Sequence, residues 1–425
     1  MNIKRMVVAL AVAMMAIGVE ASVSVSNVVC TQRYPWNGLV DIDYEVFADD
    51  PAADVWVYAI GYDKDANVSM GVRAISGDGA NAPVKPGKHR MTWNVTSDYP
   101  GFNSSAFTVK MTALVGGAPY MVVDLSGGVD AISYPVSYLS QVPEGGWTDE
   151  YKTTKLVLRL IPPGTFMMGS PSDELGRNCG YAETLHQVTL TKPFYIGIFE
   201  LTQMQWLLVM GTEKPASAKG DTYPAQGVSY NEIRGTVSGA AWPANNQVDA
   251  NSFMGRLRSK VNMLFDLPTE SQWEYACRAG TATALNSGKY LTTTGGNRCS
   301  NLDEVAWYCP RSGDKPTSCG RFLENAWGLY DMHGNVLEWC LDWLQRDWGS
   351  SARIDPNGPT SGESGYRVLR GGGHSSHYGV SRPGWGYSQY CRSAARLGTS
   401  SSYGNYNDYY NGEYFGFRVA CLPAE

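Results

Sequence analysis

The chain has 425 residues and a formal net charge of −6, and only 17% of its residues are charged. It contains no basic tract, so no nucleic-acid partner is expected, and its 43% hydrophobic content is enough for a sizeable core. The high counts of Gly (47), Tyr (26) and Trp (13) favour a loop-rich fold with much irregular backbone and exclude a simple helical bundle.

The first 21 residues have the pattern of a secretory signal peptide. Lys4 and Arg5 form a basic start, residues 6–18 are apolar, and Val19 and Ala21 place small side chains before a cleavage point. The apolar run is too short to span a membrane, and no later run approaches that length. A retained anchor is the alternative. We expect cleavage near Ala21 and a secreted, periplasmic or cell-surface protein without a membrane span.

Residues 22–140 are predicted to form a β-sandwich domain. Apolar and polar residues alternate in "LVDIDYEVF", "ADVWVYAIGY", "HRMTWNV" and "AFTVKMTALV", and turn-rich stretches separate these segments. The spacing favours an immunoglobulin-like sandwich. No residue set typical of catalysis occurs here, so we expect a spacer or recognition module. The polar, turn-rich residues 141–154 are predicted to form a linker.

The remaining residues, 155–425, have a different pattern. Thr202 is a predicted helix N-cap, and Thr269 with Gln272 forms the capping-box pattern of another helix. Between them, "VDANSFMGRLRSKVNMLF" is the most amphipathic stretch of the chain. Its apolar face is predicted to consist of Phe253, Leu257, Val261 and Leu264. After residue 286 the helical patterns fade, and Gly, Trp and Tyr dominate.

Cysteines are confined to the part of the chain after the predicted signal peptide, where export would permit disulfides. There are nine, so at least one thiol has no partner within the chain. Cys299, Cys309 and Cys319 recur at a ten-residue spacing, which suits disulfide staples between loops better than zinc, because no Cys-x-x-Cys pair is present.

Six motifs resemble, in the same order, those of the formylglycine-generating, sulfatase-modifying family. They are "GTFMMGS", "FELTQMQW", "LPTESQWEYACRAG", "NAWGLYDMHGNVLEWCLDW", "RVLRGGG" and "GFRVA". The resemblance covers about residues 155–421 and implies a variant of the C-type lectin fold. We therefore expect an α+β protein in which a β-sandwich precedes a loop-rich formylglycine-generating-type domain.

The resemblance also implies a structural calcium site in "LYDMHGNVLEW". Asp331 and Glu338 are hard oxygen donors around a Gly-Asn turn, and backbone carbonyls near Gly334 and Val336 would complete the ligand set. Asp331 stands where the family often has Asn. The alternative is that these residues cap turns and bond to the backbone.

Several large side chains of the family motifs are interpreted as structural. Arg392, Arg396 and Arg418 are expected to bridge buried carboxylates or carbonyls of a loop-rich core. His333 is interpreted as a structural turn residue. The predicted core also includes Trp327, Trp339 and Trp343.

The copper-binding cysteine pair of the family's enzymes is missing. Those enzymes oxidise a sulfatase cysteine to formylglycine with two cysteines about five residues apart, whose thiolates suit cuprous ion. Two alignments of the pair place only Ser376, Ser381, Pro383 and Ser388 at its positions. Residues 371–390 contain no cysteine, so no copper is expected. Cys391 follows too late for the pair, and either bonds to Cys340 or packs as a small hydrophobic residue.

The same region is instead rich in Tyr, Ser, Gly and Asn, the residues that dominate antibody binding loops. "HSSHYG" and "TSSSYGNYNDYYNGEY" resemble the variable regions of retroelement-diversified proteins. The alternative is an inert low-complexity loop. Contacts to a ligand are predicted for His374, Ser376, His377, Tyr378, Trp385, Tyr387, Tyr403, Asn405, Tyr406, Asn407, Tyr409 and Tyr410.

These observations favour a secreted, non-catalytic binding protein whose C-terminal loops contact a protein or glycan ligand. The first alternative is a formylglycine-generating-type oxidoreductase with a site rebuilt around Cys391 or around the pair His374 and His377, although two histidines without a third ligand make a weak metal site. The second alternative is a structural surface protein without a specific ligand.

Overall fold

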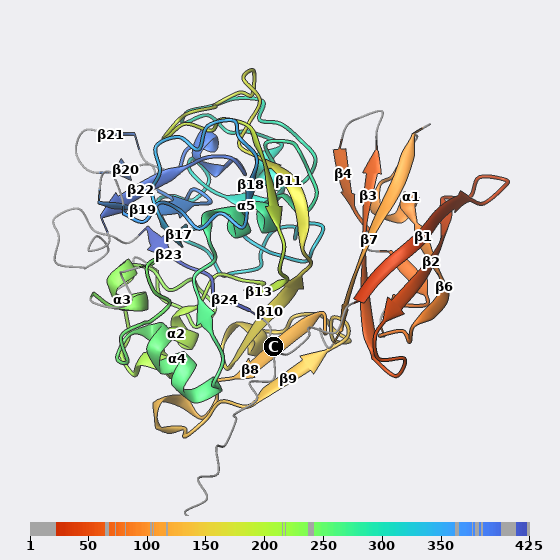
Figure 1. Cartoon of the computed structure of the whole chain (residues 1–425). Helices are drawn as coiled ribbons and strands as arrows, with labels where there is room; N and C mark the ends of the chain where they lie inside the picture. Colours follow the sequence, from red (N-terminus) through yellow and green to blue (C-terminus); the bar gives the residue numbers. More distant parts are fainter. Residues whose placement is uncertain are drawn as a thin grey trace, which may run out of the picture.

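A computed structural model gives the chain a mixed α+β structure with many strands and few helices (Figure 1). The structure describes residues 23–422 apart from 64–67, 73, 81, 103, 105, 116–117, 215, 217, 237–241, 362–364, 376, 379–381, 384–385 and 401–413. The predicted signal peptide lies outside the described residues.

Two antiparallel sheets with a core of their own form the N-terminal domain. One sheet has the order β1 (Val23–Gln32), β2 (Leu39–Ala48), β6 (Gly87–Asn94), β5 (Ile75–Gly77). The other has the order β4 (Val68–Gly71), β3 (Val55–Asp63), β7 (Phe107–Val115), and a short helix, α1 (Val95–Asp98), follows β6. Alternate residues of β2 are buried, as the sequence pattern predicted, and pack with Trp93 of β6.

The predicted domain boundary at residue 140 is wrong. The next strands, β8 (Tyr120–Asp124) and β9 (Val136–Leu139), are the edge of a sheet in the second domain. Its order is β14 (Phe265–Asp266), β24 (Ala420–Cys421), β13 (Phe194–Gly197), β10 (Lys155–Ile161), β8, β9. In β8, Met121 pairs with Leu158 of β10, so the segment before the predicted linker belongs to the larger domain. The linker itself holds a 3-10 turn, η2 (Asp149–Lys152).

Helices of the second domain begin where the capping patterns predicted. Thr202 caps α2 (Gln203–Met210) and Thr269 caps α5 (Glu270–Arg278), each with a complete capping box. The others are α3 (Tyr230–Arg234) and α4 (Phe253–Val261). The prediction for Leu264 is wrong, because α4 ends at Asn262 in a left-handed conformation and Leu264 is exposed.

Short strands complete the larger domain. One sheet has the order β22 (Leu397–Ser400), β19 (Tyr366–Arg370), β17 (Leu337–Trp343), β23 (Phe415–Gly416). Another has the order β11 (Gly164–Met168), β12 (His186–Leu190), β18 (Arg353–Ile354). Two pairs remain: β15 (Ala306–Trp307) with β16 (His333–Gly334), and β20 (His377–Tyr378) with β21 (Arg382–Pro383). The short 3-10 turns are η1 (Gly128–Asp130), η4 (Leu302–Glu304) and η5 (Ser388–Cys391).

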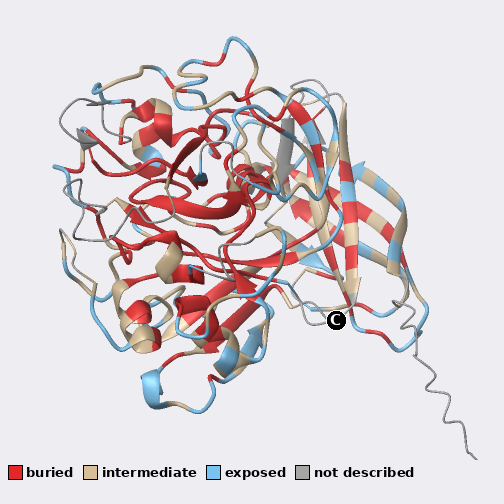
Figure 2. Ribbon diagram, turned by 60° about the vertical axis from the view of Figure 1, so that its left-hand side comes forward, coloured by how far each residue is buried: buried red, intermediate tan, exposed pale blue. Residues whose placement is uncertain are grey.

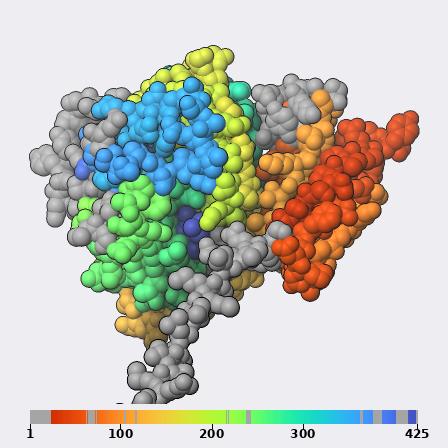
Figure 3. Space-filling view, viewed as in Figure 1, coloured from red at the N-terminus to blue at the C-terminus, as the bar shows by residue number. Residues whose placement is uncertain are grey.

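Burial is greatest along the central strands of the larger domain and alternates along the strands of the sandwich (Figure 2). The core interpretation is confirmed for Trp327 and Trp339, whereas Trp343 is half-buried beneath the Arg367 guanidinium, 3.3 Å from its ring centre. The sandwich lies beside the larger domain (Figure 3). Tyr58 and Ile60 of β3 pack against the larger domain's core.

Candidate functional site

The sheet β22-β19-β17-β23 brings together the two Tyr-rich segments, residues 371–390 and 399–414. The first segment begins directly after β19, and the second begins in β22 and ends just before β23, so the described ends of both adjoin this sheet (Figure 1). The ring of His374 in the first segment lies 5.6 Å from the ring of Tyr414 in the second. The carbonyl of Tyr414 accepts a hydrogen bond from the Leu337 amide of β17 at 2.8 Å. The described ends of the two segments therefore meet at a common base.

Buried arginines fix this base to the rest of the domain. Arg392 donates to Glu174 at 2.6 Å and to both carboxylate oxygens of Glu183 at 2.6 and 2.8 Å. Arg396 makes a two-point contact with Glu270 at 2.7 and 2.9 Å. Charge-assisted bonds of this kind are strong and directional, so they hold backbone that has little regular structure. The structural interpretation of Arg392 and Arg396 is confirmed.

Two buried histidines support the same base. His333 lies between the Cys391 carbonyl, 2.6 Å from its Nδ1, and the Asn286 amide, 3.0 Å from its Nε2. His374 lies with its Nδ1 2.7 Å from the Asn335 carbonyl. A carbonyl can only accept, so each Nδ1 carries the proton. Burial lowers the pKa of each imidazole to about 4. The structural interpretation of His333 is confirmed.

The predicted direct ligand contact of His374 needs correction, because its side chain is fully buried. It forms part of the base on which the segment rests. Tyr387 is half-buried and packs against the main core with one part of its surface left open. The backbone of His377 and Tyr378 forms β20, paired with β21. Outside the described residues lie Ser376, Trp385, Tyr403, Asn405, Tyr406, Asn407, Tyr409 and Tyr410.

All nine cysteines are free thiols in the structure, so the predicted disulfide staples are not formed. Cys340 and Cys391 lie in separate core clusters, which excludes the predicted bond between them and leaves the alternative, packing as small hydrophobic residues. Burial, with a smaller effect from nearby thiols, raises the pKa of Cys391 far above its usual range. A neutral, buried thiol is poorly suited to act as a thiolate.

The four residues predicted to bind calcium lie in one buried loop and the strand after it. Asp331 accepts from the Gly320 amide at 2.6 Å through Oδ2. Both oxygens of Glu338 accept from Arg418, at 2.6 and 2.7 Å, and one also accepts from Trp273 at 2.7 Å. Gly334 requires glycine, because a Cβ there would lie 2.3 Å from the Trp307 carbonyl oxygen and its φ is +85°. The structural interpretation of Arg418 is confirmed.

The sequence analysis missed a fifth residue, Glu200. Its carboxylate accepts from the Val336 amide at 3.0 Å and from the Asn335 side chain at 2.6 Å. Glu200, Asp331 and Cys319 place one ligand atom each within 4.8 Å of one another. The available signal was an acidic residue inside the apolar run "FYIGIFELT", since a charge is costly to bury without a partner.

Charge is unbalanced around Arg418. The Glu200, Asp331 and Glu338 carboxylates all interact with this guanidinium, and all four side chains are buried. Burial first, and then the neighbouring carboxylates, raise the pKa of Glu200 well above its usual range. Burial also raises the pKa of Asp331. Without another cation, protons must neutralise part of this cluster.

Among the residues that the structure describes, no helix combines the length and apolar character needed to cross a bilayer.

Comparison with known proteins agrees with this architecture. The family model described as "Sulfatase-modifying factor enzyme 1-like domain" matches residues 148–421. The chain is 29% identical over 220 residues to the chaperone protein LppX of Paenibacillus barcinonensis, covering 44% of this chain and 70% of LppX. It is 38% identical over 120 residues to the formylglycine-generating enzyme of Thermomonospora curvata, covering 26% of this chain and 39% of that enzyme.

Among solved structures, Treponema denticola variable protein 1 matches with a TM-score of 0.46 and 25% identity, covering 63% of this chain and 96% of that protein. The family model covers well over half of the chain, and its match lies within the larger domain, beginning after β8 and β9. The chain therefore belongs to the family of sulfatase-modifying factor enzyme 1-like domain proteins.

Proposed function

We propose that this protein is a secreted, non-catalytic binding protein whose two Tyr-rich segments form one surface for a protein or glycan ligand. The observation that supports the proposal is the contact between the rings of His374 and Tyr414, one residue from each segment. No cysteine occurs in residues 371–390, and the thiol of Cys391 is buried and neutral. The domain thus has the fold of the family but lacks the pair of cysteines that binds copper in the family's enzymes.

Tyrosine is the reason to assign binding to these segments. A tyrosine ring gives a large contact area at a low entropy cost, and small Ser, Gly and Asn residues give adaptable hydrogen bonds. The N-terminal sandwich, which we propose to be immunoglobulin-like, would serve as a spacer or second recognition module.

We further propose that the two Tyr-rich segments are diversified by a retroelement. A reverse-transcriptase gene and a near-copy of the 3′ coding end beside this gene would support that; their absence would contradict it.

The triple substitution Y403A/Y406A/Y409A is expected to weaken ligand capture by about tenfold or more, because aromatic anchors dominate such interfaces. The melting temperature should stay unchanged, since rings of the proposed binding surface would add little to folding stability. Binding is measured on a glycan microarray and against biotinylated cell-surface proteins. Y290A, which removes a half-exposed tyrosine of the same domain, is the matched control. Unchanged capture by the triple variant, or a large fall in melting temperature, would contradict the proposed surface.

The alternative activity is tested directly. Incubation with copper and a sulfatase-derived cysteine peptide should leave the peptide unmodified, as measured by mass spectrometry. Formation of formylglycine would contradict the non-catalytic proposal and would favour the rearranged oxidoreductase.

We also propose that calcium binds at Asp331, Gly334, Val336 and Glu338, with Glu200 beside them. The charge imbalance around Arg418 supports this, because three carboxylates against one guanidinium leave an excess that a divalent cation would neutralise. Carboxylate and carbonyl oxygens are the donors that calcium prefers. The ion would tie the loop before β17 to the segment that leads into α2.

Calcium at about ten times its dissociation constant should stabilise the protein by about 1.4 kcal/mol. The measurement is the melting temperature after EDTA treatment and calcium titration. D331A should lose the response, whereas D130N, which changes an exposed acid, should keep it. A wild-type protein that does not respond to calcium would exclude this site.

A further inference from the structure

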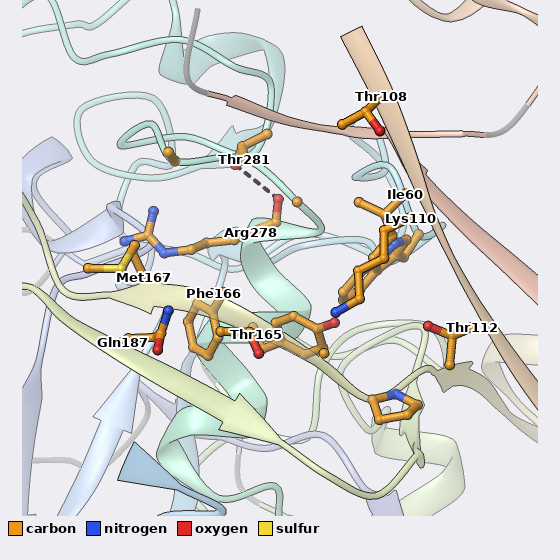
Figure 4. A pocket seen from close by; sticks show the side chains of 16 residues that line it. Ile60, Thr108, Lys110, Thr112, Thr165, Phe166, Met167, Gln187, Arg278 and Thr281 are labelled. Carbon is orange, nitrogen blue, oxygen red and sulfur yellow. Dashed lines mark hydrogen bonds between the residues drawn. The ribbon is translucent and has the colours of Figure 1, made fainter. Parts of the chain in front are cut away.

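A cavity of about 430 Å³ lies between the N-terminal sandwich and the larger domain. Strands β3 and β7 contribute one wall, with Ile60, Thr108, Lys110 and Thr112, and β11 and the end of α5 contribute the other. Lys110 points from β7 across the opening toward the side chains of β11 (Figure 4). No described residue of the Tyr-rich segments lines this cavity, so it is a separate site.

Aromatic rings form the floor of the cavity. Tyr275 of α5 packs against Phe166 at 5.1 Å and against Trp327 at 4.9 Å between ring centres. The Tyr275 side chain is almost fully buried, and its hydroxyl has no hydrogen-bond partner. A buried hydroxyl without a partner is uncommon in proteins and carries a free-energy cost. A ligand that bonds to this hydroxyl would remove that cost.

The charged side chains among the described residues that line the cavity are both cationic. Lys110 is exposed and forms no ion pair with any residue that the structure describes. Arg278 contributes a second cation, although its guanidinium already contacts Glu274 and the Gly169 carbonyl. No Asp or Glu lines the cavity. Its field therefore favours an anionic group near Lys110.

The remaining lining groups are neutral hydrogen-bonding side chains. Thr108 and Thr112 of β7 and Gln187 of β12 line the cavity, and their side chains bond to no other described residue. An aromatic floor with a few placed polar groups is typical of small-ligand sites. Hydroxyl groups of a saccharide would satisfy these side chains, whereas a purely apolar ligand would leave them without partners.

We propose that this interdomain cavity binds an acidic saccharide. Its ring lies on the floor made by Tyr275 and Trp327, its hydroxyls bond to the Tyr275 hydroxyl and the β7 threonines, and its acidic group pairs with Lys110. A carboxylate and a sulfate ester share the required negative charge. Binding links the two domains, because each contributes one wall.

The test is calorimetric titration of the full chain with three probes. They are trigalacturonate, which carries carboxylates, a sulfated chitotriose, and neutral chitotriose. Comparing the two acidic probes distinguishes recognition of a carboxylate from recognition of a sulfate ester. At least one acidic probe should bind, and the neutral probe should bind about tenfold more weakly or not at all. K110Q should weaken the acidic probe about tenfold, and Y275F should weaken it with no loss of melting temperature.

Controls separate this site from the Tyr-rich surface. K88Q, an exposed lysine on β6 outside the cavity, should bind as the wild type does. Y403A/Y406A/Y409A should also bind the acidic probe as the wild type does. The two proposals are therefore tested independently of each other. Failure of both acidic probes to bind, equal binding of the neutral probe, or unchanged binding by both K110Q and Y275F would overturn the proposal.

Discussion

Replacing Arg418 with methionine is expected to lower the free energy of unfolding by about 3–5 kcal/mol, as expected when one partner of a buried ion pair is removed. Arg418 is fully buried and donates to both oxygens of Glu338 at 2.6 and 2.7 Å. It also donates to the Gly197 and Tyr330 carbonyls, at 2.9 and 3.0 Å. Its loss leaves the Glu338 carboxylate buried, and among the described residues the Trp273 indole is then the remaining donor to its side chain.

Urea denaturation in EDTA gives the measurement. The matched control is R33M, which breaks the exposed ion pair of Arg33 with Asp41 and should change the free energy of unfolding far less than R418M does. The double variant R418M/E338L should recover part of the loss, because it removes the uncompensated charge together with its partner. A stability of R418M equal to that of the wild type would show that this ion pair does not stabilise the folded protein.

Between pH 6.5 and 8 the wild type is expected to lose about 2 kcal/mol more stability than D342N. Asp342 is fully buried, accepts from the Glu270 amide at 2.6 Å through Oδ2, and has no partner for Oδ1. Burial, followed by the Glu270 charge, raises its pKa to about 8. Glu270 itself stays ionised, since Arg396 helps to lower its pKa against the effect of burial.

The sign follows from proton binding. The folded protein holds the Asp342 proton up to about pH 8, whereas the unfolded chain releases it near pH 3.8, so stability falls as pH rises between these values. The histidines His333 and His374, with folded pKa values of about 4, act in the opposite direction, but only below about 6.5. Glu200 has the same sign as Asp342 and remains in D342N, so the difference between the two proteins isolates Asp342.

Urea denaturation at three pH values within this window measures the difference. D347N is the matched control, because Asp347 is exposed and its pKa is lowered, so it does not titrate there. Parallel curves for wild type and D342N would show that Asp342 is ionised in the folded protein.

Local patterns in the sequence predicted much of the structure correctly. Thr202 and Thr269 begin helices because a capping box involves only residues three apart in the chain. The motifs of the larger domain identified its family, and the structural interpretation of Arg392, Arg396 and Arg418 is confirmed because a buried guanidinium must find carboxylates or carbonyls.

Other predictions failed, one at a local helix end and the rest where contacts join residues distant in the chain. Leu264 fits a helical stripe, but the left-handed Asn262 ends the helix first. The strands β8 and β9 lie within the range predicted for the sandwich, yet β8 pairs with β10 and β9 pairs with β8, because a local strand pattern does not show which sheet a strand joins. His374 looked like a surface residue in a polar segment, but its ring is buried against Tyr414.

The sequence by itself determined the family, the helix starts and the lack of a copper-binding cysteine pair, because each depends on residue identities at short spacings. Only the tertiary structure decided the domain boundary, the clustering of Glu200 with Asp331 and Glu338, and the cavity between Lys110 and Tyr275. The physical reason is that sheet pairing and domain packing bring together residues more than a hundred positions apart, and no local pattern records such contacts.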